Sequence, residues 1–277
     1  MSRNTYTVPQ LEERARRLRQ HVVRMVARGG IGYLLQGLGA ADIFAALYFS
    51  ELRLREHEPD WVARDRCLLS TAHNTAIFYA ALAERGLMPA ALLNTYTADG
   101  SVLEINASER VGTIVEATCG SLGQGLSVAV GMALSLRRQG LESRVYVILG
   151  DGELQEGQVW EAALSAGGFK LDNLCMIIDR NRMQVEGHTD KVVDMDPITG
   201  KFEAFGWEAT QINGNNMAEL TASLERARRA KGKPSLVVAN TLTGSGVPFL
   251  EGQLNHLTFI SKDDAARALD ILEGVAA

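Results

Sequence analysis

Short apolar runs recur along the chain, and stretches of helical periodicity fill the intervals between them. The clearest run is RVYVIL at residues 144–149, which is almost wholly apolar, as a strand covered on both faces should be. Comparable runs at residues 66–69, 174–178 and 235–239, together with the more polar stretch at 207–212, predict further strands. Because strands alternate with helices, the pattern predicts a parallel sheet with helices on both faces.

Helical patterns occupy most of the chain between these runs. They are expected at residues 11–28, 40–52, 75–85, 122–138, 158–167 and 217–230. The expected fold class is α/β, a three-layer α/β/α sandwich with a mostly parallel sheet. No repeat or flexible linker is visible, so we expect one domain over residues 1–277. It would carry N-terminal helices at about 10–52 and a C-terminal helical tail at about 261–277.

Composition and charge narrow the functional classes. Of the 277 residues, 46% are hydrophobic and 22% are charged, which is ordinary for one large globular domain. The net charge of −5 argues against nucleic acid, and the basic cluster between Arg14 and Arg24 is typical of the solvated face of an amphipathic helix. No apolar run approaches the roughly 20 residues of a membrane helix, and no signal core is visible. The three cysteines lack metal or disulfide spacing, so we expect a cytoplasmic protein without nucleic-acid or membrane partners.

Polar residues follow two successive predicted strands. Gly150-Asp151-Gly152 ends the run at 144–149, and Asn181 follows the run at 174–178. In open parallel sheets, ligands bind at the carboxyl edge, where these side chains can meet. Carboxylate and amide oxygens, with a backbone carbonyl, are ligands suited to Mg²⁺ or Ca²⁺. The spacing predicts a metal that bridges the protein to a diphosphate; the alternative is a pair of polar turns at strand ends.

A longer string around these residues points to a family. Residues 150–187, GDGELQEGQVWEAALSAGGFKLDNLCMIIDRNRMQVEG, resemble the thiamine-diphosphate fingerprint of transketolases, especially those split into two subunits. A second match is the glycine-rich GSLGQGLS at residues 120–127. Weaker matches are GAADI at 39–43, LLSTAH at 68–73, and GSGVPFLE at 244–251 with a histidine shortly after it. The resemblance covers about residues 10–260.

This resemblance implies the cofactors and the residues that hold them. The cofactors would be thiamine diphosphate and Mg²⁺ (or Ca²⁺). Asp151, the side chain of Asn181 and the backbone carbonyl of Met183 would hold the metal, and Gly152 would contact the diphosphate. The expected fold is accordingly the diphosphate domain of the thiamine-diphosphate-binding fold.

Five further residues receive roles from the resemblance. Gly120 and Leu122 would lie against the aminopyrimidine ring, and His73 and His256 would lie near the diphosphate and the reacting carbon. Glu156 would join a carboxylate network that crosses the subunit interface, so that it and the two histidines are the implied catalytic residues. Three of these residues have simpler interpretations: Leu122 as core, His73 as the start of a helix, and Glu156 as a charge at a helix N-terminus.

The resemblance also implies a missing half. Transketolase-type enzymes need a second domain that embraces the aminopyrimidine and supplies an activating glutamate, yet only residues 261–277 remain after the matched region. We therefore expect a partner, a C-terminal transketolase subunit with the pyrimidine domain, in an α2β2 assembly. The pair would transfer a two-carbon ketol (or related acyl) unit from a ketose or oxoacid donor to an acceptor carbonyl.

Two alternatives stay open at this point. The chain could be the α-subunit of a 2-oxoacid decarboxylase or dehydrogenase, or of a pyruvate-using acyl transferase, which shares the metal motif but not the Leu-Gly-Gln-Gly loop. It could also be a non-catalytic interaction subunit, although the intact Asp151 and Asn181 argue against that interpretation.

The positions expected to contact substrate depart from the family. The family's Gly-His pair falls on Gly32-Tyr33, and its Gly-His-Pro triplet falls on Ile105-Asn106-Ala107. In the family these histidines contact hydroxyls of the donor sugar. Ala72 also replaces a glycine, and Cys119 replaces a threonine or serine. Tyr33 and Asn106 are therefore candidate substrate residues, and the change indicates either neutral drift or a different donor or acceptor.

Overall fold

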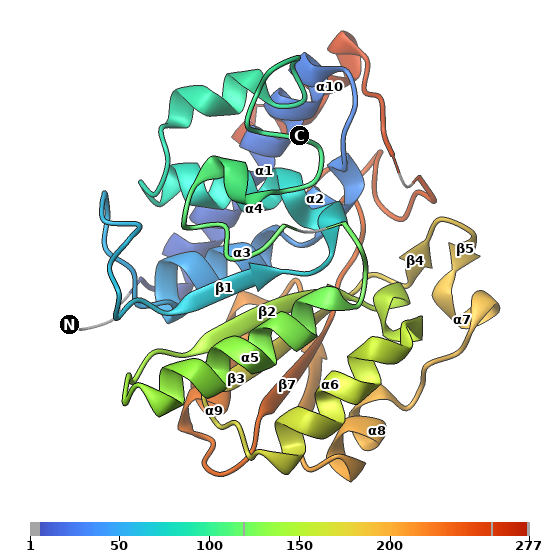
Figure 1. The fold of residues 1–277 in the computed structure, drawn as a ribbon. Helices are drawn as coiled ribbons and strands as arrows, with labels where there is room; N and C mark the ends of the chain where they lie inside the picture. Colours follow the sequence, from blue (N-terminus) through green and yellow to red (C-terminus); the bar gives the residue numbers. More distant parts are fainter. Residues whose placement is uncertain (1–5, 119, 256, 276–277) are drawn as a thin grey trace.

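The computed structural model describes residues 6–118, 120–255 and 257–275. Its centre is a sheet of five parallel strands in the order β1-β2-β3-β7-β6 (Figure 1). The strands are β1 (Arg66–Leu69), β2 (Val145–Gly150), β3 (Leu174–Arg180), β6 (Glu208–Asn213) and β7 (Ser235–Asn240). Each predicted strand is present to within about a residue or two at its ends. Four of them are largely buried apolar runs, whereas β6, at the edge of the sheet, has no buried residue.

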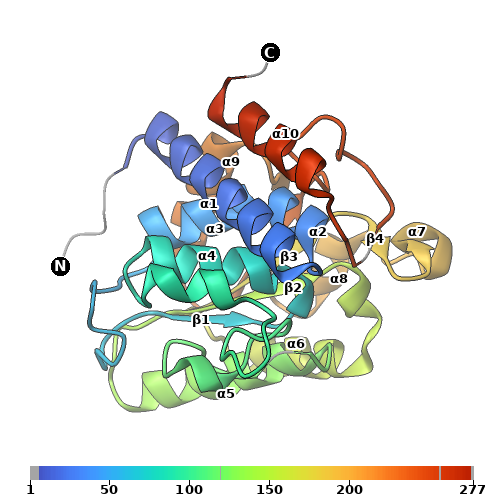
Figure 2. The ribbon, with the colours of Figure 1, turned by 90° about the horizontal axis from the view of Figure 1, so that it is seen from above.

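Helices cover both faces of the sheet, which confirms the three-layer α/β/α class (Figures 1 and 2). On β2, Tyr146 and Ile148 face one apolar core, and Val145, Val147 and Leu149 face the other, as alternation along a strand requires. The first core packs against α1 (Val8–Gly29), α3 (Ala41–Ala46), α4 (Thr75–Glu84) and α9 (Met217–Arg229). The second packs against α5 (Gln124–Arg138), α6 (Gly157–Gly168) and α8 (Ile198–Ala204).

The predicted helix at 40–52 is divided in the structure. α3 continues into the π-helical turn η1 (Leu47–Glu51), and the short helix α2 (Leu34–Gly39) precedes it. The sequence did not predict α2 because all six of its residues are buried, so no polar face marks a helical period.

The remaining elements are short, apart from the C-terminal helix α10 (Lys262–Glu273). A small hairpin follows the sheet's third strand and leads into one helical turn. In that hairpin, β4 (Met183–Gln184) pairs with β5 (Gly187–His188), and the turn is α7 (Thr189–Val192). The other short elements are η2 (Ala72–Asn74), η3 (Ala90–Thr95), η4 (Glu109–Val111) and η5 (Gly152–Gln155). Across the described ranges, no helix is both long enough and apolar enough to cross a membrane.

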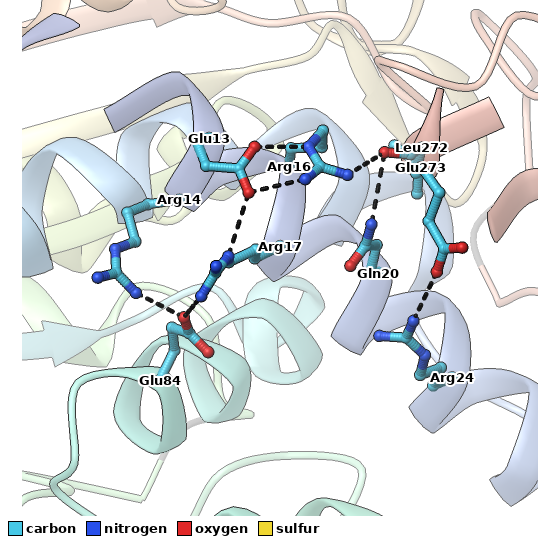
Figure 3. Close-up of polar contacts among 9 residues, drawn as sticks. All are labelled: Glu13, Arg14, Arg16, Arg17, Gln20, Arg24, Glu84, Leu272 and Glu273. Atoms are coloured by element: carbon cyan, nitrogen blue, oxygen red, sulfur yellow. Dashed lines mark hydrogen bonds and ion pairs between the residues drawn. The ribbon is translucent and has the colours of Figure 1, made fainter. Parts of the chain in front are cut away.

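Basic residues of α1 bind neighbouring helices rather than only solvent (Figure 3). Glu84 on α4 pairs with two arginines of α1, and the carbonyl of Leu272 at the end of α10 accepts hydrogen bonds from two side chains of α1. The α1 side chains in these contacts are Arg14, Arg16, Arg17 and Gln20. The cluster therefore fastens α4 and α10 to α1.

Arg19 shows where the prediction of a solvated basic face is wrong. It is 8% exposed, and its guanidinium donates to the Asp42 carboxylate (2.6 Å) and to the carbonyl of Leu38 (3.0 Å). Asp42 also accepts a hydrogen bond from Asn215. The GAADI motif therefore supplies a buried ion pair that joins α1 to α3, a contact that charge spacing in one helix cannot reveal.

Candidate active site

A cavity of about 240 Å³ opens at the carboxyl edge of the sheet, where β1, β2 and β3 end. Segments far apart in sequence form its wall. The lining residues are Thr71, His73, Leu122, Gly150, Asp151, Gly152, Glu153, Gln155, Glu156, Asp179, Asn181, Met183, Gln184, Val185 and Glu186. The structure thus brings together most of the residues to which the family resemblance assigned roles.

Asp151 lies at the base of this cavity and is 4% exposed. One carboxylate oxygen, Oδ2, accepts hydrogen bonds from the backbone N–H of Arg182 (2.9 Å) and the hydroxyl of Thr189 (3.0 Å). Burial raises the pKa of Asp151 to about 6, and the neighbouring Asp179 carboxylate contributes to the increase. A cation at this position would compensate the cost of keeping the carboxylate ionised.

The turn after β3 presents the second predicted metal ligand. Arg182 has a φ of 62°, in the left-handed region, and Asn181 Oδ1 accepts a hydrogen bond from the backbone N–H of Met183 (2.9 Å). A Cβ on Gly152 would lie 3.2 Å from Cβ of Gln184, so a larger residue at position 152 would require Gln184 to shift. A strained turn beside a buried carboxylate is a feature of functional sites.

The donor chemistry of these residues fits a hard divalent cation. Asp151 offers a carboxylate oxygen, Asn181 an amide oxygen, and Met183 a backbone carbonyl in the same turn. In the described part of the chain, no group of three or more His, Cys, Asp and Glu side chains could hold a metal. The protein would therefore supply only part of a coordination sphere at this edge.

The predicted substrate residues lie beside the predicted cofactor residues. The rings of Tyr33 and His73 meet edge to face, 5.1 Å between centroids, and the Tyr33 hydroxyl donates a long hydrogen bond to Asn106 Oδ1 (3.5 Å). The amide nitrogen of Asn106 lies 3.4 Å from where a Cβ on Gly120 would be, and Gly120 has a φ of 140°. Of these four residues, His73 lines the cavity, and the contacts link Tyr33, Asn106 and Gly120 to it in turn.

The other assigned residues differ in how far the structure describes them. Glu156 is exposed at the N-cap of α6, and Leu122 is half-buried; both line the cavity. His256 lies outside the described residues. Around it, Asn255 accepts a hydrogen bond from Gln36, and Thr258 exchanges two backbone hydrogen bonds with Gly32. The described residues on either side of it are thus held beside the segment that carries Tyr33.

Two buried carboxylates at this edge received no role from the sequence. Asp179 accepts hydrogen bonds from Asn74 (2.9 Å) and Thr241, which joins the turn that carries His73 to the ends of β3 and β7. Glu153 accepts hydrogen bonds from one side chain and two backbone N–H groups. Burial raises the pKa of both carboxyl groups. The only signal in the sequence is an acidic residue in or next to a buried strand end.

Relatives with known names identify the family. Residues 11–271 match the family described as transketolase, thiamine diphosphate binding domain. The 6-deoxy-6-sulfo-D-fructose transketolase subunit SqwG of Clostridium sp. (strain MSTE9) is 41% identical over 244 residues, which cover 88% of this chain and 89% of that protein. An apulose-4-phosphate transketolase subunit of Actinobacillus succinogenes is 37% identical over 266 residues, covering 95% of this chain and 96% of that protein.

Solved structures agree with this assignment. A transketolase from Campylobacter jejuni superposes with a TM-score of 0.88 at 30% identity over 95% of this chain and 42% of that one. The chain therefore spans about two fifths of the length of that solved transketolase. The names and lengths of the relatives confirm the resemblance to the diphosphate-binding subunit of a split transketolase and favour it over the oxoacid alternative. The chain belongs to the transketolase family, whose thiamine-diphosphate-binding domain it matches over nearly its whole length.

Proposed function

We propose that this subunit binds thiamine diphosphate through Mg²⁺ (or Ca²⁺) at the carboxyl edge of the sheet. With a partner subunit it would transfer a two-carbon ketol unit from a ketone donor to an acceptor carbonyl. The observation that carries the proposal is the buried Asp151 carboxylate facing the same cavity as the Asn181 turn. The chemistry that the cofactor supplies is carbanion stabilisation, and the protein supplies binding and orientation.

In this proposal, different residues of the cavity bind different parts of the cofactor. Asp151, the Asn181 side chain and the Met183 carbonyl hold the cation, and Gly152 lets the backbone approach the diphosphate. Opposite them, Gly120 and Leu122 form the wall against which the aminopyrimidine lies. His73, with its Nδ1 3.3 Å from the Thr71 hydroxyl, would act near the reacting carbon, and the same role is proposed for His256. Glu156, exposed at the open side, meets the partner.

Exposed apolar side chains on the cavity wall and the adjoining loop support the proposal of a partner subunit. Val185 on the cavity wall is 70% exposed, and Leu254 on the adjoining loop is 55% exposed. Phe259, further along that loop, is 74% exposed. Exposed apolar side chains around a cleft are typical of an interaction surface. We infer that a C-terminal transketolase subunit with the pyrimidine domain covers them, and the α2β2 assembly and the cytoplasmic location stay predictions.

The substrate proposal rests on Tyr33 and Asn106. Tyr33 contacts both Asn106 and His73, a residue that lines the cavity, and these contacts support the assignment of Tyr33 and Asn106 to the positions where the family has donor-contacting histidines. The names of two relatives state activity on 6-deoxy-6-sulfo-D-fructose and on apulose 4-phosphate. We therefore propose that the donor is a modified ketose rather than a common ketose phosphate.

Calorimetry on the chain with and without its partner tests the cofactor proposal. The partner would be sought as a chain of pyrimidine-domain type encoded next to this one. With Mg²⁺ present, we expect tight thiamine-diphosphate binding only by the reconstituted pair, because half a cleft buries only part of the ligand. Micromolar or better affinity of the lone chain would contradict the split site. Absence of binding by the pair would overturn the cofactor assignment.

A further inference from the structure

Glu153 is a buried carboxylate at the junction of three segments that form the site. It is 2% exposed. Its Oε1 accepts hydrogen bonds from the Ser70 hydroxyl and the backbone N–H of Gly123 (2.8 Å), and its Oε2 accepts from the backbone N–H of Gly150 (3.1 Å). One side chain therefore joins the end of β1, the end of β2 and the glycine-rich loop.

The contact extends through Ser70 to the first turn of α5. The Ser70 oxygen accepts a hydrogen bond from the backbone N–H of Gly125 (3.1 Å) while its hydroxyl donates to Glu153. The first N–H groups of a helix have no partner within it, and a negative charge is favourable beside them. α5 has no side-chain N-cap of its own, and its N-cap residue, Gly123, has a φ of 85°. Glu153 and Ser70 therefore replace the missing cap.

Close packing leaves the loop little freedom on this base. A Cβ on Gly125 would lie 2.4 Å from Cβ of Ser70, and a Cβ on Gly123 would lie 2.7 Å from Cβ of Glu156. The loop must be glycine-rich to fit, yet glycine is the residue with the most backbone freedom to lose. A fixed set of hydrogen-bond acceptors beneath the loop is what selects one conformation from many.

We propose that Glu153 is a positioning residue that holds the glycine-rich loop, and through it Gly120 and Leu122, in the conformation that receives the aminopyrimidine before the partner subunit binds. This inference rests on the proposed function, because it takes the loop as the aminopyrimidine wall. On the metal side, Glu153 accepts a hydrogen bond from the backbone N–H of Gly150, which precedes Asp151 in the chain. The hydrogen bonds to Asp151 itself, from Arg182 and Thr189, do not involve Glu153.

Glu153→Gln tests the proposal with little change in volume. An amide has one oxygen and one NH₂ group, so the NH₂ would face either the N–H of Gly150 or the N–H of Gly123, and a buried donor would lose its partner. In the reconstituted pair we expect thiamine-diphosphate affinity to fall at least tenfold, with pyrophosphate affinity, measured with Mg²⁺, within twofold of wild type. Amide hydrogen exchange of residues 120–126 should become faster.

Asp65→Asn is the matched control. Asp65 is fully buried and also accepts two backbone hydrogen bonds, from Arg53 and Arg144 (2.9 Å each), but it lies at the opposite edge of the sheet. We expect this variant to lower the melting temperature about as much as Glu153→Gln without changing cofactor affinity or exchange in the loop. If both variants change only the melting temperature, Glu153 is merely structural and the proposal is overturned.

Two further outcomes keep the proposals separate. If Glu153→Gln weakens thiamine diphosphate and pyrophosphate equally, Glu153 does not act on the aminopyrimidine wall and the inference is wrong. If Asp151→Ala leaves pyrophosphate binding unchanged, the proposed function fails instead. Should Glu153→Gln not fold, Ser70→Ala removes the hydrogen bonds to Glu153 and from Gly125 but keeps those from Gly123 and Gly150 to Glu153. It should therefore cause a smaller loss of thiamine-diphosphate affinity, again without affecting pyrophosphate. No loss in that variant would also overturn the inference.

Discussion

The amino and carboxyl edges of the sheet both have a cavity and buried charged residues, but these residues bind different groups at the two edges. The cavity at the carboxyl edge measures about 240 Å³, whereas a cavity of about 510 Å³ opens at the amino edge. Both have buried carboxylates in their walls or beside them, and the larger one is also the more basic. Its charged lining residues are Arg53, Arg137, Glu142, Arg144, Asp172, Arg228 and Lys231.

The difference lies in what the polar groups are bound to. At the amino edge, Arg144 donates to the carbonyls of Ala227 and Arg228 at the end of α9, and Arg137 donates to the carbonyl of Phe169 after α6. These arginines act as C-terminal caps. At the carboxyl edge, Asp151 instead orders loops that themselves line the cavity. Cavity size and charge do not identify a site; the segments that the polar groups position do.

Of the variants that test this comparison, Asp151→Ala should cause the largest change, a loss of cofactor affinity at the carboxyl edge. We expect the dissociation constant of Mg²⁺–thiamine diphosphate in the reconstituted pair to rise at least about 100-fold, or ~2.7 kcal/mol. The melting temperature should stay the same or rise, because the variant removes a buried carboxylate that Asp179 repels. Asn181→Ala should act in the same direction but less, since an amide carries no charge. Full affinity of both variants at limiting Mg²⁺ would remove the carboxyl edge as the metal site.

Arg144→Met is the corresponding change at the amino edge. Arg144 is 8% exposed, and its loss would remove one hydrogen bond from each of two carbonyls at the end of α9, of which that of Ala227 keeps the Ser235 hydroxyl as a donor. We expect the free energy of unfolding, from urea titration, to fall by about 2 kcal/mol. Cofactor affinity of the folded protein should be unchanged. A loss of affinity that parallels the loss of stability would show that the two edges are coupled.

The contrast between edges also explains what the sequence could predict. Asp151 and Asn181 follow apolar strands, so the rule that ligands bind at carboxyl strand ends places both at one edge. Nothing in the sequence distinguishes Glu153 from them, because its role depends on donors from Ser70 and Gly123, which lie far away along the chain. A strand pattern locates the edge but does not assign each carboxylate there.

The fold shows the same limit. Four of the five strands were predictable as continuous apolar runs, and β6 is a more polar edge strand; α2 was not predicted, because burial on all sides removes the helical period. Arg19 is the clearest failure: its charge suggested solvent exposure, but its partner Asp42 lies on another helix. Local patterns of apolar and charged residues predict the elements but not the contacts between them.

Within the carboxyl edge, Tyr33→His/Asn106→His should change which substrate is used. A histidine can donate or accept a hydrogen bond at neutral pH, whereas Tyr33 and Asn106 already share a hydrogen bond with each other. We expect the kcat/KM ratio of xylulose 5-phosphate to a modified ketose to rise about tenfold, equivalent to ~1.4 kcal/mol. If the wild type already uses common ketose phosphates well and the variant gains nothing, the two positions reflect neutral drift.

Lys231→Gln should give the smallest effect and is the sharpest check on the amino edge. Lys231 is an exposed lining residue of the larger cavity, and its ammonium group forms no ion pair with any other described residue. If this cavity is only a by-product of helix capping, the substitution should change the free energy of unfolding by no more than about 0.5 kcal/mol. Inorganic phosphate should then stabilise wild type and variant equally. Stabilisation of the wild type alone, increasing with phosphate concentration, would mean that an anion binds at this edge, because a ligand raises stability only when it binds the folded state. The amino edge would then also bind a ligand, and the contrast between the two edges of the sheet would no longer hold.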